Sequence, residues 1–201
     1  MTMRLRRSAL ALWFVLAPLV VCAAVREEPV AAVKRTLDAA LAIAQASGTR
    51  DENLAALRTV ARGFLDTQAM GRRAIGDVLA AQPKDQQAEY LALFDELIVR
   101  AYLQKLLLFR APRFSYGDAR RSGDAVLVTT RIATSKDEFR VDYEMRERDG
   151  RWLATDVIVE GISLSDNYKS QFHDLLRDRS FAELLDLMRT KTRGARPGAG
   201  S

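Results

Sequence analysis

The chain has 201 residues, of which 48% are hydrophobic, and this size suits one domain with its own core plus a targeting segment. Lysine and arginine exceed aspartate and glutamate by 31 to 26, but no basic cluster of the kind that binds nucleic acid stands out. One cysteine and one histidine are too few for a disulfide framework or a zinc site, so we expect no metal and no other cofactor.

The N-terminus has the pattern of a secretory signal peptide. Arg4, Arg6 and Arg7 precede an apolar stretch over residues 9–21, and the small residues at 22–24 offer a cleavage site. We therefore predict a signal peptide over residues 1–24, with an uncleaved membrane anchor as the alternative. Cleavage would lower the formal net charge from +5 to +2 and remove the cysteine, which is compatible with an oxidising compartment.

Apolar residues at helical spacing predict helices over 30–44, 54–64 and 70–79. A longer helix should begin near Pro83 and end before Pro112. Its apolar stripe consists of Tyr90, Leu91, Phe94, Leu97, Ile98, Ala101, Tyr102, Leu106 and Phe109. The polar positions opposite, expected to face water, are Asp85, Gln86, Glu89, Glu96, Arg100 and Gln104.

From Arg113 onward the hydrophobic period changes from that of a helix to that of a strand. Alternation is clear over 126–132 and 139–145, and Asp149 with Gly150 predicts a tight hairpin before the strand that starts at Trp152. These patterns predict an antiparallel meander of about four strands.

Two helices should close the domain, the second with a capping box formed by Ser180 and Glu183. Residues 194–201 have the composition of a disordered tail, so the folded domain is expected over residues 25–193. Helices, then a meander, then helices predict an α+β fold in which a twisted antiparallel sheet packs against helices.

The stretch 152–172 couples the last long strand to a helix, and Gly161 permits the bend between them. On this strand, Asp156 and Glu160 alternate with Val157 and Val159, and we expect both carboxylates on the surface.

Three blocks of sequence, 66–76, 94–102 and 152–172, occur in order behind the predicted signal peptide. Together they resemble the MlaC (toluene-tolerance) family of periplasmic phospholipid-binding proteins, over approximately residues 30–191. The resemblance implies a fold like nuclear transport factor that encloses an apolar lipid pocket. It also implies a monomeric periplasmic carrier, not an enzyme, that moves phospholipid or a related lipid such as a hopanoid. Its expected partners are an inner-membrane ABC transporter complex and an outer-membrane lipoprotein complex, which together maintain outer-membrane lipid asymmetry.

Side chains from one helix, the sheet and the following helix are the candidate lipid-binding residues. They are Phe94, Leu97, Ile98, Tyr102, Val126, Val128, Phe139, Val141, Tyr143, Val157, Val159, Tyr168 and Phe172. Candidate headgroup residues, which could hold a phosphate, are Arg72, Arg73, Arg100 and Lys169. The alternative for each is a solvated position or a salt bridge to Asp66, Asp95 or Glu96.

The residues alone leave two other functions possible. A periplasmic adaptor would have a filled core and act only through its surface. A small-pocket enzyme would need pocket carboxylates, but Asp142 and Glu144 are predicted to point away from the apolar face, and His173 has no obvious partner. The sequence also has no glycine-rich phosphate loop and no Gly-x-Ser-x-Gly motif, so we predict no catalytic residues.

Overall fold

The computed structural model describes residues 28–106 and 112–193, and also leaves out the side chains of Ala101, Tyr102 and residues 104–106. The predicted signal peptide, the predicted tail and Phe109 lie outside the described residues, as does the side chain of the candidate lipid-binding residue Tyr102.

The described chain confirms the predicted α+β architecture and its order of helices, meander and helices. The first helical part comprises α1 (Pro29–Gln45), α2 (Arg50–Phe64), α3 (Thr67–Ile75), the 3-10 turn η1 (Gly76–Leu79) and α4 (Lys84–Leu106). The strands are β1 (Arg113–Ser122), β2 (Ala125–Ala133), β3 (Glu138–Arg148), β4 (Arg151–Val159) and the short β5 (Ile162–Ser163). Two helices follow, α5 (Leu164–Asp178) and α6 (Phe181–Arg193). None of the described helices has both the length and the apolar character that crossing a bilayer requires.

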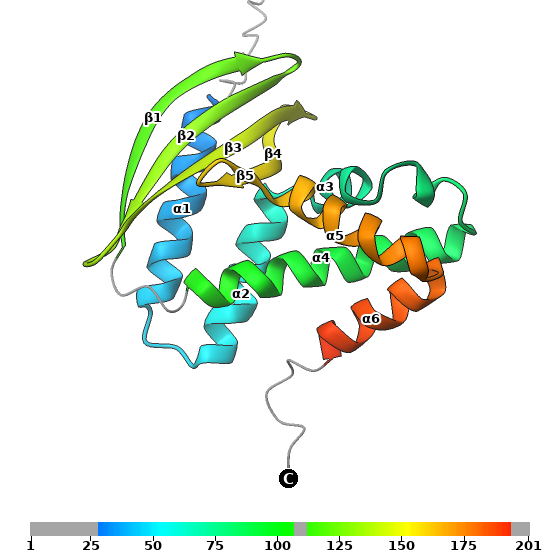
Figure 1. Cartoon of the computed structure of the whole chain (residues 1–201). Coiled ribbons are helices and arrows are strands. Elements are labelled where there is room, and N and C mark those ends of the chain that lie inside the picture. Colours follow the sequence, from blue (N-terminus) through cyan, green and yellow to red (C-terminus); the bar gives the residue numbers. More distant parts are fainter. Residues whose placement is uncertain (1–27, 107–111, 194–201) are drawn as a thin grey trace, which may run out of the picture.

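The strands form one antiparallel sheet in the order β1-β2-β3-β4-β5, so the predicted meander gains a fifth strand of two residues. Val128 of β2 pairs with Tyr143 of β3, and Tyr143 pairs with Val157 of β4, which places the three side chains on one face. The sheet curves over α1 on this face (Figure 1). Asp149 and Gly150 both have positive φ angles, as the tight turn predicted between β3 and β4 requires.

Helix α4 connects the two halves of the domain (Figure 1). Near its N-terminus, Tyr90 and Phe94 pack with Phe172 of α5 and Phe181 of α6. Near its C-terminus, Val99 and Leu103 pack instead with residues of α1 and α2. The long apolar stripe therefore serves two separate parts of the core.

Local capping interactions explain where several helices begin. Thr49 and Glu52 form a capping box at the start of α2. The capping box predicted for the last helix is confirmed, because the Ser180 backbone N–H donates to Glu183 at 2.7 Å and the Glu183 N–H donates to the Ser180 hydroxyl at 3.3 Å.

One position on α4 differs from its predicted environment. Arg100 was expected on the polar, water-facing side, but only 7% of the residue is exposed. Its guanidinium donates a hydrogen bond to the backbone carbonyl of Thr192, at the end of α6. The prediction was wrong because helix periodicity does not show that α6 returns to cover this side of α4.

Candidate functional site

An apolar hollow of about 130 Å³ lies between the helices and the inner face of the sheet. It is lined from α1 by Thr36, Leu37 and Ala40, from α2 and the residue after it by Leu57, Val60, Ala61, Phe64 and Leu65, and from α4 by Ile98, Val99 and Leu103. The sheet and α5 contribute Tyr143, Val157 and Leu164. Thr36, Val60, Leu65 and Val157 are only partly buried, so the hollow reaches the surface.

The lining has no charged side chain and only two hydroxyl groups. The Thr36 hydroxyl donates to the carbonyl of Ala32 at 2.9 Å, so the helix itself satisfies it. Burial raises the pKa of Tyr143, which keeps this phenol neutral. The ring of Tyr143 meets that of Phe64 edge to face, with centroids 5.6 Å apart. A surface of this kind binds hydrocarbon by burial and offers few directional contacts.

The candidate lipid-binding residues fall into three groups. Ile98, Tyr143 and Val157 line the hollow itself. Phe94, Leu97, Tyr168 and Phe172 belong to the cluster of α3, α4, α5 and α6, where the rings of Phe94 and Tyr168 meet at 5.4 Å. Val126, Val128, Val141 and Val159 belong to the cluster under the sheet with α1 and α2, and the partly buried Phe139 pairs with Ile132 of β2.

None of the lining residues from α1 and α2 was among the candidate lipid-binding residues. The same helical spacing that predicted these helices also identified Leu37, Leu57 and Ala61 as apolar positions. No feature of that spacing tells a stripe that faces a hollow from one that faces a filled core.

The four candidate headgroup residues have different environments, and none of them lines the hollow. Arg73 of α3 is surrounded by carboxylates, with its guanidinium 2.9 Å from Asp166, 3.2 Å from Glu144 and 3.3 Å from Asp156. The hydrogen bond from Arg73 is the main reason that the pKa of Asp166 is lowered. Arg100 is buried against α6, Arg72 is exposed on α3, and Lys169 is exposed on α5.

The acidic residues that were named as possible salt-bridge partners of the candidate headgroup residues pair with other arginines instead. Asp95 pairs with Arg62 and Glu96 with Arg58, both at 2.9 Å, and these contacts join α2 to α4. Asp66 pairs with Arg148 of β3, also at 2.9 Å.

Asp156 is the main correction to the predicted site. It was expected on the surface, but it is fully buried, with 0% exposure. Its carboxylate accepts hydrogen bonds from the backbone N–H of Ser165 at 3.2 Å, from the Ser165 hydroxyl at 3.0 Å and from the Ser163 hydroxyl. Asp156 thus fixes the start of α5 against β4, in the sequence block that carried the family resemblance. By contrast, Glu160 is exposed as predicted.

Fold and site together define the class of protein: an α+β domain with an open antiparallel sheet and an apolar hollow between the sheet and the helices. Within the described ranges, no group of three histidine, cysteine or acidic residues could hold a metal ion. The sequence model of the MlaC protein family matches residues 32–190, and the chain therefore belongs to this family.

A solved structure agrees with the fold. It is a phospholipid-binding protein from Ralstonia solanacearum in complex with a phospholipid, and it is 22% identical to this chain with a TM-score of 0.75. The match covers 84% of this chain and 98% of the other.

Proposed function

We propose that this chain binds a phospholipid, or a related lipid such as a hopanoid, and carries it as a monomer through the periplasm. Its partners would be an inner-membrane ABC transporter complex and an outer-membrane lipoprotein complex. The observation that carries the proposal is the uncharged hollow between sheet and helices. Membership of the MlaC family and the bound phospholipid of the Ralstonia protein support binding and transport over catalysis.

The energetics of lipid transfer suit such a lining. A diacyl lipid has about 30 methylene groups, and at about 0.8 kcal/mol each their removal from water gives about 24 kcal/mol. That figure exceeds the practical limit of about 18–21 kcal/mol for non-covalent affinity. A bilayer buries the same surface, however, so transfer from membrane to protein is nearly neutral. Small docking energies at the partner complexes would then set the direction.

The size of the hollow adds a requirement. Its volume of about 130 Å³ is below the roughly 300–1,000 Å³ of pockets that hold drug-sized ligands. Binding acyl chains would therefore require the helices α1 and α2 to move away from the sheet. We propose the residues that line the hollow as the first contacts of the chains. Further candidates that would be reached as the hollow enlarges are Val126, Val128, Phe139, Val141, Val159, Phe94, Leu97, Tyr168 and Phe172. Tyr102 stays a candidate from the sequence alone.

Extraction of the purified protein with organic solvent, followed by lipid mass spectrometry, tests binding. We expect about one lipid per chain. A second assay, with labelled lipid in donor vesicles that carry the inner-membrane complex, tests transfer. A protein that comes out bare and still joins the two complexes would be the adaptor instead.

A further inference from the structure

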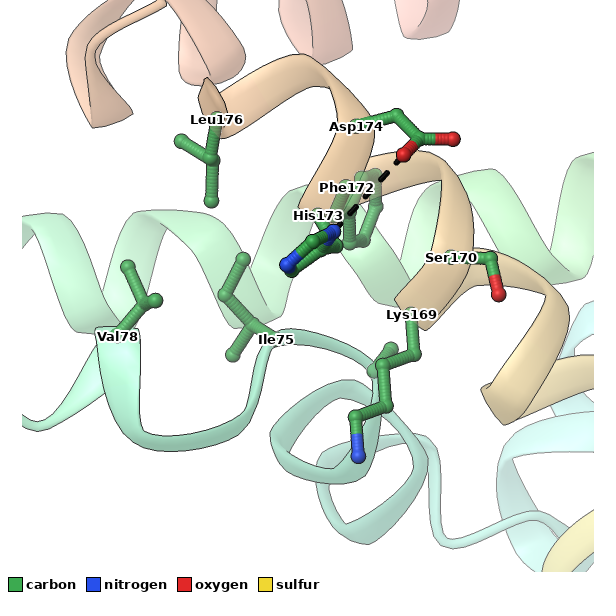
Figure 2. A pocket seen from close by; sticks show the side chains of 9 residues that line it. Ile75, Val78, Lys169, Ser170, Phe172, His173, Asp174 and Leu176 are labelled. Carbon is green, nitrogen blue, oxygen red and sulfur yellow. Dashed lines mark ion pairs between the residues drawn. The ribbon is translucent and has the colours of Figure 1, made fainter.

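The short strand β5 holds an apolar side chain in water. Ile162, its first residue, is 62% exposed, and among the described residues only it and Val78, at 39%, are exposed large hydrophobic side chains. Val78 lies on η1 at a groove that shares no residue with the hollow, with Ile75 beside it and Leu176 of α5 opposite (Figure 2). Ile162 differs from Val78, because the chain on both sides of it leads into the hollow.

The register of the sheet places Ile162 on the face that forms the hollow. Ile162 pairs with Val159 of β4, and paired residues of antiparallel strands have their side chains on the same face. Val159 shares this face with Val157, two residues before it, which lines the hollow. Leu164, two residues after Ile162, lines the hollow as well. A row of apolar side chains thus leads from the exposed Ile162 through the partly buried Val159 to Val157 in the hollow.

The turn that carries Ile162 is held in place from both sides. Glu160 and Gly161 have φ angles of 50° and 81°, the positive values that a tight two-residue hairpin turn requires. The Glu160 backbone N–H donates to the carbonyl of Arg140 at 2.9 Å, and the Arg140 N–H donates to the Glu160 carboxylate. An ordered backbone therefore presents Ile162 at this position. Exposure to water gives the side chain little stabilising burial, so folding alone does not require an apolar residue here.

We propose that Ile162 marks the mouth of the hollow and guides the acyl chain of a lipid through it. The inference rests on the proposed function, because its occupant is the chain of the bound lipid. A chain that enters or leaves has methylene groups in water while it is partly inserted, and each of them raises the free energy of that state. Ile162 covers some of these groups during the passage. It contacts the chain only in transit, so it affects the rates of entry and exit and not the amount of lipid bound.

Exchange kinetics of a fluorescent phospholipid test the proposal on the mature protein. Stopped-flow mixing measures uptake from phosphatidylcholine vesicles and release to unlabelled vesicles, and the fluorescence at saturation measures occupancy. We expect Ile162→Asp to slow uptake and release alike by about tenfold at unchanged occupancy, because a partly inserted chain loses its apolar contact. Ile162→Leu, which keeps an apolar side chain, should have the rates of the wild type. Val78→Asp changes the other exposed apolar residue in the same way and should alter neither rate.

The outcomes separate this inference from the proposed function. Equal rates in Ile162→Asp and the wild type, at equal occupancy, would overturn the inference and leave the proposed function intact. Reduced occupancy in a folded Ile162→Asp protein would make Ile162 part of the binding site, which contradicts a residue that acts only in transit. A wild-type protein that takes up no lipid from the vesicles would refute the proposed function and the inference with it.

A lipid dissolved as monomers separates the mouth of the hollow from a contact with membranes. Uptake of a fluorescent short-chain phosphatidylcholine below its micellar concentration involves no bilayer, and we expect Ile162→Asp to slow this uptake too. An effect confined to vesicles would assign Ile162 to the membrane surface. An effect that requires the inner-membrane complex would assign it to a protein partner, and either result would contradict a role at the mouth. Cooperative thermal unfolding of each variant shows that the fold survives.

Discussion

Replacement of Asp156 by alanine should destabilise the domain by about 3 kcal/mol. The buried carboxylate accepts from three donors at the start of α5, which are the backbone N–H of Ser165 and the hydroxyls of Ser165 and Ser163, and also from the backbone N–H of Val157 at 2.9 Å. Each buried donor left without an acceptor costs about 1–3 kcal/mol, and the low end applies here because hydroxyls can reorient. Arg73 keeps its contacts with two other carboxylates, so its charge is not left unpaired. Asp156→Asn retains one acceptor oxygen and should cost about half as much.

Urea unfolding followed by circular dichroism measures the effect. With a slope of about 2 kcal/mol/M, the midpoint of Asp156→Ala should fall by about 1.5 M while the slope stays unchanged. Asp178→Ala, at an exposed position near the end of the same helix, is the matched control and should shift the midpoint little. A decrease of less than about 1 kcal/mol in the free energy of unfolding of Asp156→Ala would refute the conclusion that this carboxylate holds the start of α5 against β4.

Three other predictions follow from single features of the fold. Ala61→Trp should fill the hollow and lower bound lipid several-fold in a folded protein, while Ala55→Trp on the exposed side of α2 should not; equal lipid in both would remove Ala61 from the site. The hydrogen bond from Arg189 lowers the pKa of Glu89, so this pair stabilises the fold above the ordinary glutamate pKa of about 4.3 and loses its effect as pH falls through the lowered value. Arg189→Met should therefore lower the melting temperature more at pH 7 than at pH 3, and an equal loss at both would contradict the ion pair. Gly161 has a φ of 81°, so Gly161→Ala should cost about 1 kcal/mol in urea unfolding, and no change would show that the turn relaxes.

The sequence predicts those parts of the fold that depend on local periodicity and turn chemistry. Alternation over 139–145 identified the face of β3 that packs in one core cluster with residues of α1. The Asp149–Gly150 turn set the pairing of β3 with β4. Both signals arise within a few residues of the chain, where side-chain direction follows from backbone geometry.

Burial that depends on distant segments could not be predicted in this way. Asp156 alternates with valines as a surface residue would, yet Arg73 of α3 and the first turn of α5 cover it. Arg100 likewise has the position of a solvent-facing residue on α4, but the end of α6 covers it. In both cases the partner lies far away in sequence, so only the packed structure shows which polar groups are removed from water.

In the candidate site, too, local features could be predicted from the sequence and features that depend on packing could not. The apolar stripes that supply Leu37, Ala61 and Ile98 are visible in the sequence, but the space between them is not. Whether facing stripes touch or leave a hollow depends on the separation of helices and sheet, which a periodic pattern does not encode.

Native mass spectrometry of the mature protein, purified from the periplasm of a Gram-negative host, tests the central claim most directly. The account predicts a main species heavier than the bare chain by the mass of one lipid, which collisional activation releases as an identifiable phospholipid or related lipid. The heavier species should be depleted in Ala61→Trp. A bare mass under gentle ionisation, in a protein whose unfolding is cooperative, would contradict a lipid-binding interior.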